Sequence, residues 1–340
     1  MNTMSPSAPA WNSPELFPKS DSPRVAKYRQ LQSWYREVQL GVEAGGSGTY
    51  AALGSYLHAD AVAAQRDLNF LHPAAHEHAE TRGREVQAEG GSLDPKRLFH
   101  NMLSSMPLCF NLFGAMRGEH EAFLPVFREL FDPDATKISE IICEWAPSAP
   151  SASLGDRTAF DAVIFYVAGA ESRFVGIETK YTEPFSAKPY DRPEYRTLTR
   201  ESDWFVDGAD VELLKSAKSN QLWRNVMLAA ALDREGSRGQ GHVAVVALDD
   251  DAGASAALDI VRPQMAPSHA DRLMSRTFSE ILSAVEELAP ELSWWAVNFR
   301  RRYLLSAPPA GEPAERDPLG PAFGRGLAET VTLAEPSSGP

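Results

Sequence analysis

Two hydrophobic segments in the middle of the chain predict neighbouring β-strands. Residues 161–167 and 173–180 are rich in β-branched and aromatic residues, which favour strands. A short segment that contains Gly169 separates them, and this arrangement is typical of a β-hairpin. We therefore predict an antiparallel pair whose turn centres between Gly169 and Ala170.

This register brings polar side chains together on the hairpin. It places Asp161 directly opposite Glu178, and directly opposed side chains share one face of a sheet. Lys180 lies two residues beyond Glu178 and shares that face, while Thr179 points to the other face. The pattern thus predicts one site with two acids and a lysine.

The remaining pattern predicts helices around the hairpin and two further strands. Helices are expected over 25–40, 50–71, 96–103, 119–131, 211–232 and 272–288, and strands over 138–145 and 242–248. From residue 119 onward the order is helix, strand, strand, strand, helix, strand. This order predicts an α/β sandwich with a mixed central sheet, preceded by a helical N-terminal region.

The predicted strand over 138–145 carries a further acid near its end. Alternation puts Glu144 on one face with Ile142, and Cys143 and Trp145 on the other. Glu144 is either an additional acid of the site or a solvent-facing residue at a strand end.

The predicted helix over 211–232 carries amides on one stripe. Gln221 lies on this stripe with Leu214 and Asn225, at spacings of three and four residues. Gln221 is therefore a candidate for the site, and a surface or capping role is the alternative.

The acid pair needs a compensating charge. Two carboxylates that face each other across a ladder destabilise the sheet, and apolar neighbours add a desolvation cost. Mg²⁺ suits such a pair because it takes oxygen ligands and is usually held by one or two carboxylates with waters and phosphate oxygens. A nearby lysine orients a bound water and offsets charge on phosphorus. The residues favour phosphodiester hydrolysis.

At this point the sequence resembles a known family. Asp161, followed by Glu178-Thr-Lys180 at the end of the next strand, is similar to the pattern of the PD-(D/E)XK nuclease superfamily. Four flanking segments, 106–114, 154–161, 177–183 and 221–225, resemble a bacterial, restriction-endonuclease-like branch of it, and the resemblance covers roughly 95–250. One departure is Phe160, which stands where the family name expects proline.

The resemblance implies a Mg²⁺-dependent endonuclease that acts on DNA, in restriction or another defence against foreign DNA, with Mn²⁺ able to substitute. The candidate catalytic residues are Asp161, Glu178, Lys180 and Gln221, and the candidate metal ligands are Asp161, Glu178, Thr179 and Glu144. Arg224 and Asn225 are the next candidates beside Gln221. Two alternatives stay open: a nuclease directed at RNA, and a nucleic-acid-binding or scaffold protein that keeps the fold without cutting.

Composition sets the expected domain boundaries. A chain of 340 residues with 43% hydrophobic residues is long enough to bury a core. Residues 1–23 are Ser/Pro-rich and residues 306–340 are rich in Pro, Gly and Ala, so both predict disordered tails. Between them we expect a helical region over 24–105 and the nuclease-like domain over 106–305.

The net charge of −13 argues against an extensive basic DNA-binding surface. Residues 181–200 mix four cations with tyrosines and acids, and this predicted loop either contacts phosphates and bases or is an ordinary solvated loop. Three neighbouring histidines, His72, His76 and His78, lack a metal-ligand spacing and are interpreted as loop residues.

The remaining features concern location and partners. Cys109 and Cys143 lie in apolar stretches and are expected to be small buried residues. The chain lacks a predicted signal peptide or membrane span, so a cytoplasmic protein is the default expectation. A homodimer and a co-encoded partner protein are plausible because double-strand cutting often needs two active sites.

Overall fold

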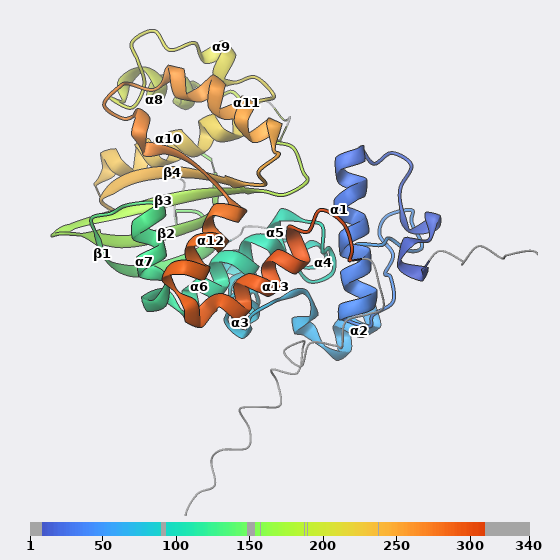
Figure 1. The fold of residues 1–340 in the computed structure, drawn as a ribbon. Helices are drawn as coiled ribbons and strands as arrows, with labels where there is room; N and C mark the ends of the chain where they lie inside the picture. Colours follow the sequence, from blue (N-terminus) through green and yellow to red (C-terminus); the bar gives the residue numbers. More distant parts are fainter. Residues whose placement is uncertain are drawn as a thin grey trace, which may run out of the picture.

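A mixed five-stranded sheet forms the centre of the molecule (Figure 1). The computed structural model describes residues 9–89, 93–147, 154–156, 158–186, 188, 190–236 and 238–309. The strands, in their order across the sheet, are β1 (Ala135–Trp145), β2 (Phe160–Ala168), β3 (Glu171–Lys180), β4 (Gln240–Ala247) and β5 (Leu273–Thr277). β1, β2 and β3 are antiparallel neighbours, whereas β3, β4 and β5 run parallel. The predicted mixed sheet is confirmed.

The hairpin of β2 and β3 has the predicted register. Ala162 pairs with Ile177, so the next position outward places Asp161 opposite Glu178. The turn contains Gly169 with a φ of 60°, a left-handed conformation that glycine adopts without steric cost.

Helices cover both faces of the sheet (Figure 1). One layer contains α8 (Pro193–Glu201), α9 (Val211–Leu214), α10 (Asn220–Glu235) and α11 (Ala252–Val261). The opposite layer contains α3 (Pro73–Ala88), α5 (Ser105–Cys109), α6 (Ala115–Gly118), α7 (His120–Leu130), α12 (Phe278–Leu288) and α13 (Ser293–Tyr303), with α1 (Pro23–Trp34), α2 (Ala59–Ala64) and α4 (Pro95–His100) beside it. The short 3₁₀ segments are η1 (Ala10–Asn12), η2 (Pro14–Leu16), η4 (Arg66–Asn69), η6 (Arg262–Gln264), η7 (Ala270–Arg272) and η8 (Pro290–Leu292), and η3 (Tyr35–Gln39) and η5 (Phe110–Gly114) are π-helical. No helix in these described ranges is long and apolar enough to cross a bilayer.

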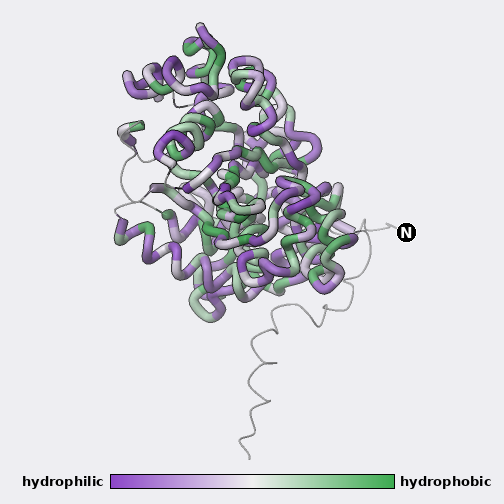
Figure 2. The backbone as a smooth tube through the Cα atoms, turned by 90° about the vertical axis from the view of Figure 1, so that its left-hand side faces the viewer, coloured by the Kyte–Doolittle hydropathy of each residue, from purple (hydrophilic) through white to green (hydrophobic). Residues whose placement is uncertain are grey.

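Two hydrophobic cores flank the sheet. The core below α10 contains Val163 of β2 and Trp223 of α10. The other contains Ile164 of β2 together with Leu31 of α1, so the N-terminal helical region shares a core with the sheet. Hydrophobic and hydrophilic segments alternate along the backbone (Figure 2), which is the pattern expected of elements packed on one side.

The expectation of a disordered tail over residues 1–23 is corrected for residues 9–23. These residues form η1, η2 and the start of α1, Leu16 is buried, and Trp11 packs against the first core. The Ser33 hydroxyl donates to the Trp11 carbonyl at 2.7 Å. The packing of Leu16 and Trp11 therefore orders residues 9–23, although their composition is Ser/Pro-rich. Residues 1–8 and 310–340, the outer parts of both predicted tails, lie outside the described residues.

The single helix predicted over 211–232 is instead two helices. The Ser219 hydroxyl donates to the carbonyls of Leu213 and Leu214, both at 2.9 Å, and these bonds replace continued helical bonding. Serine favours such local bonds over helix continuation. Helix α10 therefore begins afresh at Asn220.

Two other predictions of secondary structure were wrong. Residues 273–277 form β5 rather than helix, and α12 starts only after Thr277, which forms a capping box with Glu280. Residues 50–71 contain only short helical segments, and the longer helix is α3, whose first residue is Pro73. His76 and His78 lie on this helix rather than in a loop.

Candidate active site

The carboxylate of Glu178 is the centre of a buried polar cluster at the end of β3. Its Oε1 lies 2.6 Å from the ammonium nitrogen of Lys180 and accepts a 2.6 Å hydrogen bond from the Gln221 amide. Its Oε2 accepts a 2.6 Å bond from the Asn225 amide. Glu178 is 1% exposed, so this buried charge depends on all three partners.

Helix α10 supplies the two amides because Gln221 and Asn225 lie four residues apart and project from one face. The Gln221 carbonyl oxygen accepts from Lys180 Nζ at 3.2 Å and from the Ser186 backbone at 2.9 Å. The amide of Gln221 therefore joins the acid, the lysine and the segment after β3.

The side chain of Lys180 is 6% exposed and its ammonium group lies 4.5 Å from the centre of the Phe185 ring. Burial alone lowers the pKa of this group, but the carboxylates of Glu178 and Asp161 outweigh burial and raise the pKa above its ordinary value. Lys180 is therefore a cation and hydrogen-bond donor at neutral pH.

Asp161 occupies the facing strand and is held by Thr179. The Thr179 backbone amide and hydroxyl donate to Asp161 Oδ2 at 2.8 and 2.9 Å. The prediction that Thr179 faces away from the acids is therefore incomplete, because its hydroxyl contacts Asp161. The cause is an irregular start of β2, where Phe160 and Val163, three residues apart, pack in the same core.

Burial and then the nearby Glu178 carboxylate raise the pKa of Asp161 to about 7, although Lys180 and the Thr179 bonds act in the opposite direction. The carboxyl of Glu144 behaves in the same way, since burial and Asp161 raise its pKa to about 8. Burial and the neighbouring carboxylates thus disfavour the ionised forms of Asp161 and Glu144.

Glu144 lies opposite Asp161 across the β1 and β2 ladder, between the pairs formed by Cys143 with Ala162 and Trp145 with Phe160. The register therefore places Glu144 level with Asp161, while the residue itself is partly exposed. Its φ of 52° is left-handed. The alternation of β1 breaks here, so Trp145 packs in the core below α10, not on the Cys143 face as predicted.

Phe160 stands where the family name has proline, and its aromatic ring has a packing role. It stacks on Trp145 with an interplanar angle of 8°. The same ring covers Gly176 of β3, where an added Cβ would lie 2.5 Å from it. A glycine at position 176 is therefore required by the phenylalanine at position 160.

The donor set at these strand ends suits a hard cation with few protein ligands. Asp161, Glu178, Thr179 and Glu144 offer only oxygen atoms, and burial together with neighbouring carboxylates disfavours the charged forms of Asp161 and Glu144. Within the described ranges, however, no three His, Cys, Asp or Glu side chains converge as a ready metal site. A hard divalent cation suits such oxygen donors, since ions of this kind are held by one or two carboxylates and retain waters.

Arg97 and Glu183 form a rim to the site that the sequence did not indicate. Glu183 accepts from the Ser105 backbone at 3.0 Å and from Arg97 at 3.2 Å. Arg97 also donates to the Ser104 hydroxyl at 2.6 Å. Only the basic character of Arg97 was visible in the sequence, because its partner comes from a distant segment.

Arg224 lies three residues after Gln221 on α10 but has other partners. It donates to Asp156 at 3.3 Å and to the Thr158 hydroxyl at 2.7 Å, and it lies over the Tyr190 ring. It therefore contacts the segment before β2 rather than Glu178.

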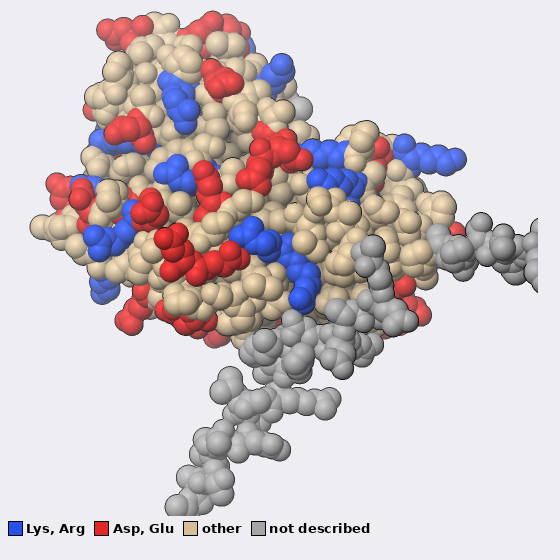
Figure 3. Space-filling model, viewed as in Figure 1, with Lys and Arg blue, Asp and Glu red and all other residues tan. Residues whose placement is uncertain are grey.

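The predicted loop over 181–200 contains helix α8, and two of its four cations have acidic partners. Arg196 contacts both Asp191 and Glu212, and Arg192 lies 3.5 Å from Glu194. On the face shown in Figure 3, acidic and basic side chains are interspersed rather than gathered into one positive area.

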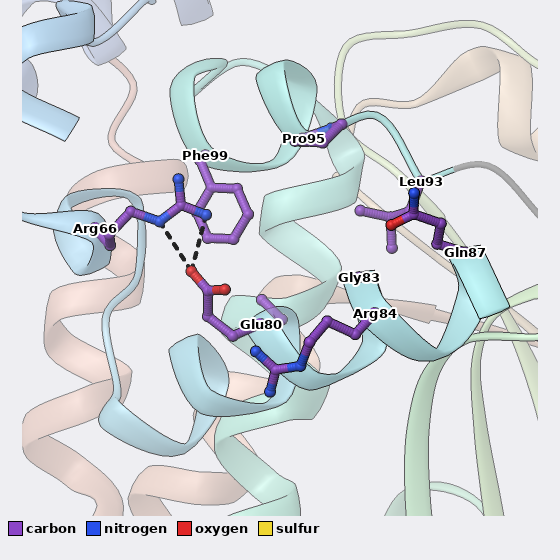
Figure 4. A pocket seen from close by; sticks show the side chains of 9 residues that line it. Arg66, Glu80, Gly83, Arg84, Gln87, Leu93, Pro95 and Phe99 are labelled. Carbon is purple, nitrogen blue, oxygen red and sulfur yellow. Dashed lines mark hydrogen bonds and ion pairs between the residues drawn. The ribbon is translucent and has the colours of Figure 1, made fainter. Parts of the chain in front are cut away.

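A separate cavity of about 380 Å³ lies between α3 and α4. Arg66 covers the Phe99 ring at 4.1 Å and pairs with Glu80 at 2.9 Å, and Arg84 borders the same space (Figure 4). The cavity lacks an acid pair with a lysine, so its lining does not repeat the chemistry of the strand ends.

Comparison with known proteins identifies the family. A family model of the PD-(D/E)XK nuclease superfamily matches residues 19–305, which is wider than the region 95–250 over which the motifs resemble it. No curated protein and no solved structure gives a match. The mixed sheet with helices on both faces is consistent with the restriction-endonuclease-like fold. Because the match spans most of its length, the chain belongs to the PD-(D/E)XK nuclease superfamily.

Proposed function

We propose that the protein is a metal-dependent endonuclease that hydrolyses phosphodiester bonds in DNA. The observation that carries this proposal is the meeting of Glu178 and Lys180 with Asp161 at adjacent strand ends, supported by amides from α10. Membership of a nuclease superfamily supports the reaction class.

Each residue has a distinct part in the proposed reaction. Lys180, kept protonated by the acids, donates to the attacking water and offsets the negative charge that grows on the phosphorus oxygens. Gln221 orients that ammonium group and holds Glu178 in place. Thr179 fixes one oxygen of Asp161 and leaves the other for a ligand.

Asp161 and Glu178 would hold Mg²⁺ or Mn²⁺, with Glu144 and Thr179 contributing further oxygens. A bound divalent cation supplies Lewis-acid stabilisation of the phosphate and lowers the pKa of its water. The raised pKa values of Asp161 and Glu144 support this role, since a cation compensates the charges that burial otherwise disfavours.

DNA is the proposed substrate because attack on phosphorus by this set of residues does not use a 2′-hydroxyl. The net charge of −13 and the paired cations around α8 imply that binding depends on local contacts near the site. Restriction of foreign DNA is the proposed role, and a homodimer with two sites would cut both strands.

The test is incubation of supercoiled plasmid, modified and unmodified, with the wild type and the Lys180→Ala variant in Mg²⁺, Mn²⁺ or EDTA. We expect nicked or linear product with metal, and a loss of at least about 100-fold in the variant. Lys137→Ala, an exposed lysine on β1, is the matched control and should cut normally.

Equal cutting by wild type and Lys180→Ala would contradict the assignment. Absence of cutting in every condition, with cleavage of an RNA substrate instead, would redirect the proposal to RNA. Absence of both, together with no Mg²⁺ binding by calorimetry, would favour a scaffold that keeps the fold without activity.

A further inference from the structure

The backbone of β1 has an unusual conformation at Glu144. Glu144 is the one non-glycine residue with a positive φ, at 52°, in the part of the chain that the structure describes. Side chains with a Cβ are disfavoured there, and glycine or asparagine would be accommodated more readily. Strained conformations of this kind persist only where surrounding contacts hold them, and they concentrate at functional sites.

Helix α3 provides those contacts. Arg82 donates from Nε to the Cys143 carbonyl at 3.1 Å and from Nη2 to the Glu144 carbonyl at 2.9 Å. His78, one turn earlier, accepts from the Cys143 backbone amide at 2.9 Å. One buried guanidinium and one buried imidazole therefore bond three backbone groups at the bend, the Cys143 amide and the carbonyls of Cys143 and Glu144.

The remaining donor of Arg82 does not compete with this role. Its Nη1 bonds Glu85 at 2.6 Å on the same helix, which orients the guanidinium plane toward β1. The side chain of Arg82 is 5% exposed, so it is fixed by packing as well as by its bonds.

The bend has two results at the end of the strand. Trp145 crosses to the other core and stacks on Phe160. Glu144 stays level with Asp161 in the neighbouring strand, which is in turn level with Glu178. A row of three acids across three strands therefore depends on the backbone at position 144.

We propose that Arg82 is a positioning residue of the active site, which holds Glu144 in its left-handed conformation so that the Glu144 carboxyl joins Asp161 at the site. The proposal rests on the proposed function of the acids. It adds a contribution from the N-terminal helical region, since α3 precedes the sheet in the chain.

The experiment is a double-mutant cycle between Arg82→Lys and Glu144→Gly. Lysine keeps the charge but has no fork that reaches two carbonyls. In the wild-type background we expect Arg82→Lys to lower kcat by about 10- to 100-fold with little change in KM. Glu144→Gly should lower activity similarly while raising the melting temperature, because glycine removes the strain.

The decisive comparison is Arg82→Lys in the Glu144→Gly background. If Arg82 acts through Glu144, this second change should have little further effect on kcat. A loss of the same factor in both backgrounds would show a general structural role and overturn the proposal, as would full activity of Glu144→Gly. Arg29→Lys, a buried arginine of α1 that bonds Asp21 and Ser55, is the control and should leave kcat unchanged.

If the wild type cuts no substrate, that result counts against the proposed function. The positioning role of Arg82 is then tested with the same four variants by measuring their Mn²⁺ affinity with calorimetry. Arg82→Lys should weaken Mn²⁺ binding by about 10- to 100-fold only when Glu144 is present. Equal weakening in both backgrounds, or none in either, would overturn the positioning role.

Discussion

Asp161 links the chemistry of the site to the stability of the protein. Its pKa of about 7 in the fold lies above its ordinary value of 3.8. The folded metal-free protein therefore keeps a proton that the unfolded chain has lost, and stability falls as pH rises from about 4 to about 7. We expect the melting temperature in EDTA to fall over this interval, and Asp161→Asn to flatten the dependence.

Asp132 is the control for this prediction, because its contribution to stability changes with pH in the opposite direction. Asp132 bonds Tyr166 and Arg173, which outweigh its burial and lower its pKa. Its stabilisation is present above the ordinary aspartate pKa and is lost as pH falls, so Asp132→Asn should weaken the protein most at neutral pH. A pH dependence that Asp161→Asn leaves unchanged would contradict the shifted pKa.

Asn225 tests the support of the buried carboxylate. Asn225→Ala removes the bond to Glu178 Oε2 and leaves a buried charged oxygen without a protein donor. We expect a loss of about 1.5–3 kcal/mol in the free energy of unfolding, measured with urea. Asn12→Ala, which removes one partly buried bond between neutral amides, is the control and should cost less. A cost below about 0.5 kcal/mol would show that another donor replaces the amide.

For single residues, the sequence predicted the positions of Asp161, Glu178, Lys180 and Gln221, because hairpin register and helical spacing depend on residues close in sequence. The structure places them together as predicted, and their roles in cleavage stay predictions. Arg82 was not predictable, because its partners lie about sixty residues away and no local pattern relates α3 to the end of β1.

The close packing of β2 and β3 gives a prediction for the strand pair. Gly176→Ala would place a methyl group against the Phe160 ring, which is already stacked on Trp145 and has little room to move. We expect a loss of about 1–3 kcal/mol in unfolding free energy, from overpacking.

Gly83→Ala is the matched control because it adds the same methyl group in the middle of α3, where nothing lies within 4 Å. Alanine is the better helix former, so this variant should be more stable by up to about 1 kcal/mol. Thermal melts measure the stability of both variants. An equal change in stability for Gly176→Ala and Gly83→Ala would contradict the packing argument.

Elements with a clear local pattern of apolar residues were predicted correctly. Elements whose bounds depend on hydrogen bonds outside that pattern were not. The hairpin and the core order of helix and strands are confirmed. The break before α10 depends on one serine hydroxyl, and β5 is a five-residue strand whose ladder partner lies in β4, some thirty residues earlier. Neither effect appears in a periodicity of apolar residues.

For the whole molecule, the shared core determines which fragments fold. The core that contains Leu31 and Ile164 spans α1 and the sheet, and Arg302 of α13 bonds the Asn69 carbonyl at 3.0 Å while buried. We expect a fragment over 106–305 to show no cooperative thermal transition, whereas residues 9–309 should melt cooperatively.

Circular dichroism with temperature compares the two fragments, and a cooperative melt of the shorter one would show that the 24–105 region is dispensable. The sequence predicts a helical region over 24–105, but composition alone does not reveal how much of the core this region supplies. Arg302 illustrates the difficulty, since it belongs to a run of three arginines in the last turn of α13 and yet is fully buried.

The antiparallel arrangement of β1, β2 and β3 also has a consequence for the order of folding. The connections between β1, β2 and β3 are shorter than the segment between β3 and α10, so the three strands close smaller loops when they pair. We therefore expect the three acids to approach one another before the amides of Gln221 and Asn225 arrive. We expect refolding in stopped-flow experiments to be fastest in mildly acidic solution, where Asp161 and Glu144 keep their protons, and hydrolysis to require the opposite condition.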